Sequence, residues 1–150
     1  MARVALLTIL AAAVLAPAAQ GAVANGGGRG TVDGTKPFSD FGFSVSVENG
    51  AVHGHFNCLM AGSSRFPGFT LMAVRGRIKA ATITGNAASF DGAGTLLTVV
   101  AGKQTKSPAT FHVEVTRGGP GVGTLRLTVL TPMVLALPVE HVLVGRISIR

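Results

Sequence analysis

Apolar and polar residues alternate one by one through most of this chain, and this period of two limits what it can fold into. The clearest run is 41–48, where phenylalanine and valine occupy every second position. Successive side chains of a β-strand point to opposite faces of a sheet, so each such run predicts a strand with one apolar face. After residue 24 no stretch of helical length has the 3.6-residue period of an amphipathic helix, and an all-β chain is expected.

Pairs of residues that favour tight turns separate these runs. Asn49-Gly50 is the strongest short hairpin signal, and it joins the first run to a second alternating run at 51–58. The segment 82–101 holds three short apolar runs and two further turn signals, Gly85-Asn86 and Asp91-Gly92, so it predicts a three-stranded β-meander. The alternative is that these two dipeptides mark ordinary loops with no fixed strand pairing.

The rest of the chain continues the same pattern. Further strands are predicted at 71–79, 111–116, 124–129 and 143–150, with a bulge near Ala80-Ala81 and with Leu143, Ile147 and Ile149 on the apolar face of the last strand. Loops are expected at 61–68 and 102–108, a turn at 118–121, and a packed connection or edge segment at 133–139, which prolines interrupt. About eight short strands joined by turns predict an antiparallel β-sandwich, with a β-barrel as the alternative.

The first 24 residues have the features of a secretory signal peptide. Arg3 is followed by an apolar run at 4–15 and then by small residues. The end of this segment predicts cleavage after Ala24, and cleavage after Gly21 is the second option. A membrane anchor is the competing interpretation, but the apolar run is shorter than the roughly 20 residues needed to cross a bilayer. We therefore expect a secreted, extracellular product with no membrane anchor in the mature chain.

The mature chain is long enough for one domain and too short for two. Removing residues 1–24 from 150 leaves 126. Residues 25–37 are rich in glycine and predict a flexible leader, with a short strand at 29–33 as the alternative, and 38–150 are expected to form a single β-sandwich domain. Of 13 basic residues only Arg3 is lost, so 12 basic and 6 acidic residues give a charge of +6, which favours acidic partners. A single cysteine excludes an internal disulfide.

Several turn-and-strand motifs span most of the mature chain. They are Phe41-Gly42-Phe43, Val52 to Phe56, Gly85-Asn86 with Ala88, Phe90, Gly92 and Gly94, Phe111, Val113 and Val115 leading into Gly119-Pro120-Gly121, and Gly145 with Ile147 and Ile149. Together they resemble a family of secreted bacterial β-domains, the post-COAP type, often found at the ends of larger cell-surface proteins. The resemblance implies no enzymatic activity and no settled ligand. Arg117-Gly118 stands where that family tends to carry an acidic turn, so a cation-binding role is not implied.

Residue types that bind metals occur together at His53, His55 and Cys58. Imidazole and thiolate are ligands that zinc and copper prefer. In a strand, however, both histidines point to one face while Cys58 points to the other with Val52 and Phe56, so the three cannot close on one ion. We therefore predict no metal site and no cofactor, with solvated histidines. Cys58 is expected to be buried, rather than a reactive thiol or a crosslink to a partner.

The sequence lacks the signatures of common enzymes. The six acidic residues are scattered, none belongs to a recognisable motif, and Gly-x-Ser-x-Gly is absent. Sugar sites usually employ exposed aromatic faces, but tryptophan and tyrosine are absent, and only Phe66 and Phe69 are placed to serve, unless both pack into the end of the core. No specific nucleic-acid motif is present. We expect a non-catalytic protein, with a small secreted hydrolase as the alternative class.

The one candidate binding site in the sequence is a row of basic residues, Arg75, Arg77 and Lys79. Because they occupy alternate positions, they are expected about 6 to 7 Å apart on the solvent face of one strand. Such a row suits a polyanion, for example an acidic polysaccharide, but we favour a plain solvated face that also protects a strand edge. The predicted function is a secreted module with a structural or binding role at the cell surface or outside the cell, and anionic polymers are its candidate ligands.

Overall fold

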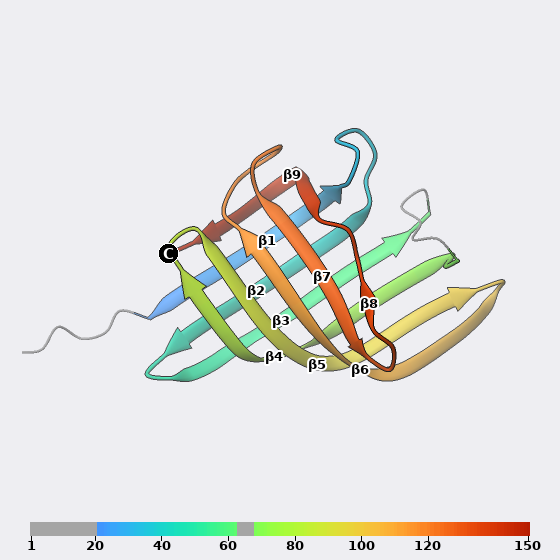
Figure 1. Ribbon diagram of the computed structural model, residues 1–150, viewed down its shortest axis with the longest axis horizontal. Helices are drawn as coiled ribbons and strands as arrows, with labels where there is room; N and C mark the ends of the chain where they lie inside the picture. Colours follow the sequence, from blue (N-terminus) through green and yellow to red (C-terminus); the bar gives the residue numbers. More distant parts are fainter. Residues whose placement is uncertain (1–20, 63–67) are drawn as a thin grey trace, which may run out of the picture.

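The computed structural model describes residues 21–62 and 68–150, and most of these residues belong to β-strands (Figure 1). In this part of the chain no helix is long and apolar enough to cross a membrane. The strands are β1 (Ala22–Thr31), β2 (Ser39–Glu48), β3 (Ala51–Ala61), β4 (Leu71–Thr84), β5 (Ala87–Val100), β6 (Lys103–Thr116), β7 (Thr124–Thr131), β8 (Leu135–Ala136) and β9 (Glu140–Ile149). Their pairings are antiparallel, which confirms the predicted all-β antiparallel class.

The sheet closes on itself. Its strand order is β6-β5-β4-β3-β2-β1-β9-β7-β8, and an additional pairing between β6 and β7 joins the two sides. Figure 1 shows β7 crossing β1, β2 and β3 at a steep angle, while the long strands β4, β5 and β6 bend from one layer into the other. The two layers of the predicted sandwich are therefore parts of one continuous ring of strands, with the core between them.

A close approach of two strands accompanies the bend of β4 and β5. Gly76 on β4 lies directly opposite Gly94 on β5. A Cβ atom on Gly94 would lie 2.0 Å from the carbonyl oxygen of Arg75 and 2.4 Å from the Cα atom of Gly76. The absence of a side chain at Gly94 therefore sets how closely these two backbones can pass.

A β-bulge in β4 lies just beyond this glycine pair. The register with β5 shifts between Ile78 and Ala80, so that Lys79 is the extra residue. Beyond the bulge, Ala81 and Ile83 are the residues that pack against the core. The bulge predicted near Ala80-Ala81 is confirmed, beginning at Lys79, and it bends the strand where the layers meet.

The core is built from the inward-facing positions of the alternating strands. Its largest members include three phenylalanines, Phe56, Phe90 and Phe111, all at most 1% exposed. Phe43 continues this group, and successive rings lie 5.3 to 6.0 Å apart in tilted orientations, which is a favourable geometry for aromatic pairs. Cys58 is 1% exposed and lies in the same core, as predicted from its phase in the strand.

The hairpin turn predicted at Asn49-Gly50 is confirmed. The φ angles of these residues are 50° and 78°, the positive values that a tight two-residue turn requires. The turn joins β2 to β3, with Glu48 opposite Ala51. Gly85-Asn86 also joins β4 to β5 as a two-residue turn, but there only Gly85 has a positive φ angle, 58°. Both turns were predicted from their two residues alone.

Asp91-Gly92 is not a turn, and the predicted three-stranded meander has two strands in this segment. β5 continues from Ala87 to Val100, and the chain reverses at Ala101-Gly102. Asp91 lies opposite His112, and its carboxylate contacts the imidazole at 2.8 Å. Gly92 lies opposite Phe111, whose ring would be 2.2 Å from a Cβ atom at that position. These contacts with β6 keep Asp91 and Gly92 in an extended strand, and the chain does not turn there.

Two segments that were predicted to be irregular are strands. The flexible leader predicted at 25–37 is wrong for its first seven residues, because β1 pairs with β2 on one side and with β9 on the other. In β1, Gly26 leaves room for the ring of Phe43, which would lie 2.7 Å from a Cβ atom there. The polar loop predicted at 102–108 is also wrong, because β6 begins at Lys103 and pairs with β5 along its length. In both segments, pairing with neighbouring strands produces a strand that the local sequence does not indicate.

The segment 133–139 is the edge element that was predicted. Its only strand, β8, has two residues and pairs with β7. Met133, Val134 and Val139 are exposed around it, whereas Leu137 is buried in the core. The prolines at 132 and 138 flank this short strand, in agreement with the restriction that proline places on strand pairing.

Candidate functional site

The predicted basic row lies on β4, and we call Arg75, Arg77 and Lys79 the basic strip. All three side chains are exposed, on the opposite face from the buried residues Met72, Val74 and Ile78. Arg75 and Arg77 follow the regular alternation of the strand, while Lys79 is the extra residue of the bulge. The sequence therefore placed the strip on the correct face, and the bulge changes the spacing only at its last member.

Protection of a strand edge does not explain the two arginines. β4 is paired with β3 from Leu71 to Arg77 and with β5 over the same residues, so both arginines stand in the interior of the sheet. Their neighbours on β3 are Asn57 for Arg75 and His55 for Arg77, and both neighbours are exposed. The strip therefore adjoins further hydrogen-bonding groups and no strand edge at these two positions.

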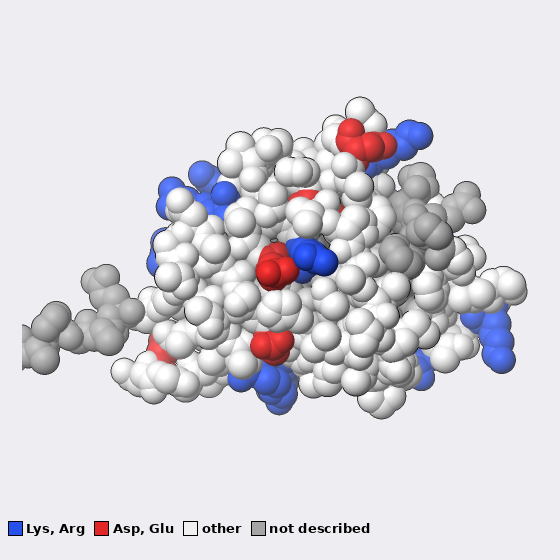
Figure 2. Space-filling model, in the orientation of Figure 1, with Lys and Arg blue, Asp and Glu red and all other residues white. Residues whose placement is uncertain are grey.

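The acidic side chains near this face are engaged elsewhere. Asp40 on β2 contacts Arg29 at 3.2 Å, and Asp91 on β5 contacts His112 at 2.8 Å. Arg75, Arg77 and Lys79 form no ion pair with the described acidic residues. Figure 2 shows an acidic and a basic side chain next to each other in the middle of the face that it draws, while most other lysine and arginine side chains lie at the outline. The described acidic residues therefore do not neutralise the positive charge of the strip.

A groove adjoins the strip on the same outer face, and we call it the outer groove. Its volume is about 420 Å³, and its lining comes from four neighbouring strands, with Leu59, Leu71, Ala73, Arg75, Thr95, Leu97, Gln104 and Lys106. Arg75 belongs to both the groove and the strip. Sequence reasoning missed Lys106, because 102–108 was predicted to be a loop and nothing local indicates that β6 lies beside β5 there.

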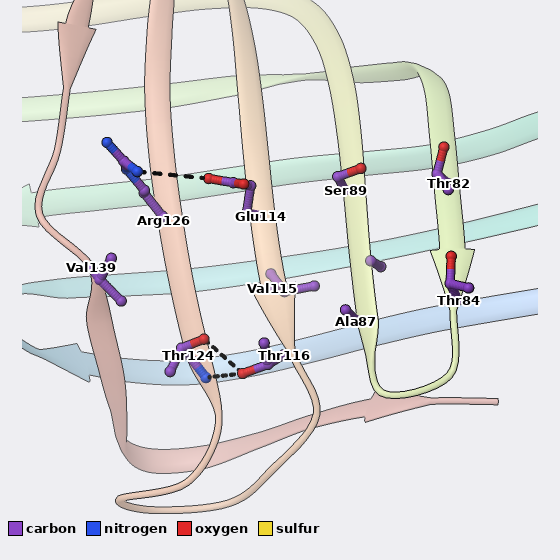
Figure 3. Close-up of a pocket in the computed structure, with 11 residues that line it drawn as sticks. Thr82, Thr84, Ala87, Ser89, Glu114, Val115, Thr116, Thr124, Arg126 and Val139 are labelled. Atoms are coloured by element: carbon purple, nitrogen blue, oxygen red, sulfur yellow. Dashed lines mark hydrogen bonds and ion pairs between the residues drawn. The ribbon is translucent and has the colours of Figure 1, made fainter.

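A second hollow, of about 350 Å³, lies on the outer surface of β4, β5, β6 and β7 (Figure 3). Its wall carries hydroxyl groups, including those of Thr116 and Thr124, which hydrogen-bond each other at 2.6 Å. In the part of the lining that the structure describes, the only ionised groups are Glu114 and Arg126, which face each other at 4.0 Å. Because these two charges compensate each other, this hollow has less attraction for a charged ligand than the outer groove has.

The histidine and cysteine cluster has the arrangement that the sequence predicted. His53 and His55 are exposed, whereas Cys58 is buried on the opposite face of β3. Among the described residues, no three histidine, cysteine, aspartate or glutamate side chains lie close enough together to hold a metal ion. The geometry thus leaves His55 available as a neighbour of the basic strip.

The nearest approach to a catalytic arrangement is the pair of Asp91 and His112. Their atoms Oδ1 and Nδ1 are 2.8 Å apart, which would orient the imidazole as in an acid–base dyad. Thr128 lies opposite His112 on β7, but no hydrogen bond joins their side chains in the described structure. None of the three lines either hollow described above. Among the described residues, no serine, threonine or cysteine side chain is hydrogen-bonded to this pair.

A bulge in β9 turns a charged residue into the core. Ile147 and Ile149 are buried as predicted, but the register with β1 then shifts, and Val142 faces the core in place of Leu143. The same shift places Glu140 inward. Glu140 is 0% exposed, and it is the only ionisable side chain besides Cys58 in the buried set of the described residues.

The environment of Glu140 disfavours its charged form. The Ser39 hydroxyl donates a hydrogen bond of 2.5 Å to Oε2, while Oε1 has no hydrogen-bond partner among the described residues. Burial raises the pKa of Glu140 to about 7, against the lowering effect of the Ser39 hydrogen bond. Burial, and then the nearby Glu140 charge, raises the pKa of the Cys58 thiol far above its ordinary value. Both groups are enclosed and are not candidates for binding a ligand from solution.

Of the two phenylalanines considered for sugar binding, Phe66 lies outside the described residues, and Phe69 is half-buried two residues before β4. No protein-family model, no curated protein and no solved structure matches this chain. Any function assigned to it therefore rests on its own residues and their geometry.

Proposed function

We propose that this chain is a non-catalytic, secreted β-domain that binds anionic polymers, such as acidic polysaccharides, through its basic strip. One observation carries the proposal. Arg75 and Arg77 lie two residues apart on an interior strand, both exposed and without an acidic partner among the described residues, where edge protection gives no reason for them. These charges on one strand offer a polymer two contacts at the regular strand spacing, and Lys79 in the bulge adds a third.

The neighbours of the strip support the same interpretation. Guanidinium groups bind phosphate, sulfate and carboxylate oxygens through paired N–H donors. Asn57 and His55, one strand away, add side-chain donors next to Arg75 and Arg77. Such contacts are mainly between charges, so the expected binding is strongly dependent on salt and shows little selectivity among polyanions.

Changing Arg75, Arg77 and Lys79 together to glutamine tests the proposal. The wild-type chain is expected to be retained on immobilised polyphosphate at low salt and to elute only when salt is raised. The triple variant is expected to elute near the void volume. In solution, the logarithm of affinity falls with the logarithm of salt concentration, and the magnitude of this slope should be smaller by about 2 to 3 in the variant, because up to three contacts are lost. The thermal midpoint should be nearly unchanged, since all three side chains are exposed.

A matched control removes the same charge from dispersed positions. Lys36 lies between β1 and β2, while Lys103 and Arg117 lie at opposite ends of β6, and all three are exposed. Their triple glutamine variant should keep most of the retention. Equal losses in the two variants would mean that net charge, and not the basic strip, determines binding.

The signal peptide belongs to the same proposal, and the position of β1 bears on its cleavage. β1 begins at Ala22, and Ala24 is 0% exposed, opposite Val45 on β2 and Ile149 on β9. Cleavage after Ala24 would remove a buried residue from a central strand, whereas cleavage after Gly21 leaves the strand whole. We therefore expect the secreted protein to begin at Ala22, as N-terminal sequencing would show. A mature chain that begins at Asn25 would contradict this cleavage site.

A further inference from the structure

We propose that the outer groove binds a single anionic amphiphile, with the alkyl chain over Ala73 and the acidic head between Arg75 and Lys106. This extends the proposed function, since Arg75 belongs to both sites, and it rests on that function only for the anionic head. The groove has the volume of a small-molecule site, about 420 Å³. Among the described residues, its lining combines aliphatic side chains with two cations and contains no acidic residue.

The apolar part of the groove follows from the register of three strands. Ala73 on β4 has Leu59 opposite it on β3 and Leu97 opposite it on β5. Leu71 precedes it by two residues on the same face. Side chains directly across an antiparallel pair lie about 4.5 to 5.5 Å apart, so the small Ala73 becomes a depression with leucine on three sides. Leu59 remains 38% exposed, which leaves apolar surface for a ligand to cover.

The polar part of the groove lies on its remaining sides. Arg75 follows Ala73 by two residues and closes the fourth side of the depression. Lys106 on β6 lies opposite Leu97, so a cation stands at the end of the same cross-strand row. Gln104 on β6 and Thr95 on β5 add hydrogen-bonding groups at the rim. Apolar carbon next to two unpaired cations complements a molecule with an alkyl chain and an acidic head.

The depression accommodates one chain rather than a bilayer surface. Its floor is a single alanine, and its walls come from side chains on the adjacent strands. Binding to a membrane surface would call for a broad apolar patch with many cations around it. The proposed occupant is therefore a monomeric anionic amphiphile, and n-decyl phosphate below its micellar concentration is a suitable probe.

The test compares n-decyl phosphate with inorganic phosphate on the folded chain, by calorimetry and by backbone amide shifts in NMR. We expect decyl phosphate to bind at least about tenfold more tightly than phosphate, with shifts centred on β4 and β5. Ala73→Leu fills the depression without changing the charge of the groove. It should weaken the binding of decyl phosphate at least about tenfold, while retention on polyphosphate stays as in the wild type. Lys106→Gln should weaken the binding of decyl phosphate several-fold. This second variant tests the groove if Ala73→Leu does not fold.

Ala80→Leu is the matched control, because Ala80 is exposed on the same strand outside the groove. It should leave decyl phosphate binding unchanged. The inference is overturned if decyl phosphate binds no better than phosphate, or if Ala73→Leu binds it like the wild type. It is also overturned if the chain binds phosphatidylglycerol vesicles but not the monomer. Because Arg75 belongs to both sites, the basic-strip variant should also bind decyl phosphate more weakly. A wild-type chain that binds decyl phosphate but is not retained on polyphosphate would contradict the proposed function and leave the groove inference standing.

Discussion

Replacing Glu140 by glutamine is expected to stabilise the folded chain at pH 8 by at most about 3 kcal/mol and to remove most of its pH dependence between pH 4.5 and 7. The side chain is 0% exposed, its Oε1 atom lacks a hydrogen-bond partner among the described residues, and burial raises its pKa from 4.5 to about 7. A difference of about 2.5 pKa units corresponds to about 3 kcal/mol between the two protonation states. Glutamine has nearly the same shape and no charge.

The sign of the pH dependence follows from proton binding. Below pH 4.5 the carboxyl group is protonated in the folded and the unfolded chain, so it carries no penalty. Between pH 4.5 and about 7 the unfolded chain loses this proton before the folded chain does, and stability falls as pH rises. Above about pH 7 the penalty stays constant. Urea unfolding at pH 4, 6 and 8 would measure this dependence in the wild type and in Glu140→Gln.

Glu48→Gln is the matched control, since Glu48 is exposed at the end of β2. It should leave the pH profile close to that of the wild type. At pH 4, Glu140→Gln and the wild type should have nearly equal stability. A variant that is less stable at pH 8, or that keeps the wild-type fall between pH 4.5 and 7, would show that the Glu140 carboxylate is compensated in the fold.

Gly94→Ala is expected to destabilise the fold by about 3 kcal/mol or to prevent folding. A Cβ atom there would lie 2.0 Å from the carbonyl oxygen of Arg75 and 2.4 Å from the Cα atom of Gly76. Both contacts are with backbone, so no side-chain rotation relieves them and β4 must move away from β5. Overpacking of this kind costs about 1 to 3 kcal/mol and occasionally more. The midpoint of thermal or urea unfolding measures the loss.

Gly27→Ala provides the comparison, because Gly27 is also a strand glycine but a Cβ atom there would meet nothing closer than 3.7 Å. Its stability should stay within about 0.5 kcal/mol of the wild type, or rise slightly, since alanine loses less backbone entropy on folding than glycine. Equal stabilities of the two variants would mean that β4 and β5 can separate without cost, contrary to the packing argument for Gly94.

Much of the strand pattern was predictable because it depends on short stretches of sequence. The alternation in 41–48 and the turn at Asn49-Gly50 are local, and the structure has both as predicted. The same local reasoning placed Arg75 and Arg77 on the exposed face of β4 and Cys58 in the core. In each case the deciding property, the direction of a side chain or the φ angle of a turn, is set by neighbours along the chain.

Contacts between distant segments decided the remaining features. Asp91-Gly92 has the composition of a turn, yet His112 and Phe111 on β6 make it part of a strand. β1 has little alternation, and its place between β2 and β9 makes it a central strand. No pattern within a single segment could indicate these pairings.

The sequence by itself determined the all-β class, most of the strands and the exposed face of the basic strip, because these depend on alternation and turn residues. Only the tertiary structure decided that β4 is an interior strand, that Lys106 lies beside Leu97 in the outer groove, and that a bulge turns Glu140 into the core. The physical reason is the range of the interactions. Register, bulges and strand order come from hydrogen bonds and packing between residues far apart in the chain, and they set which side chains share a surface.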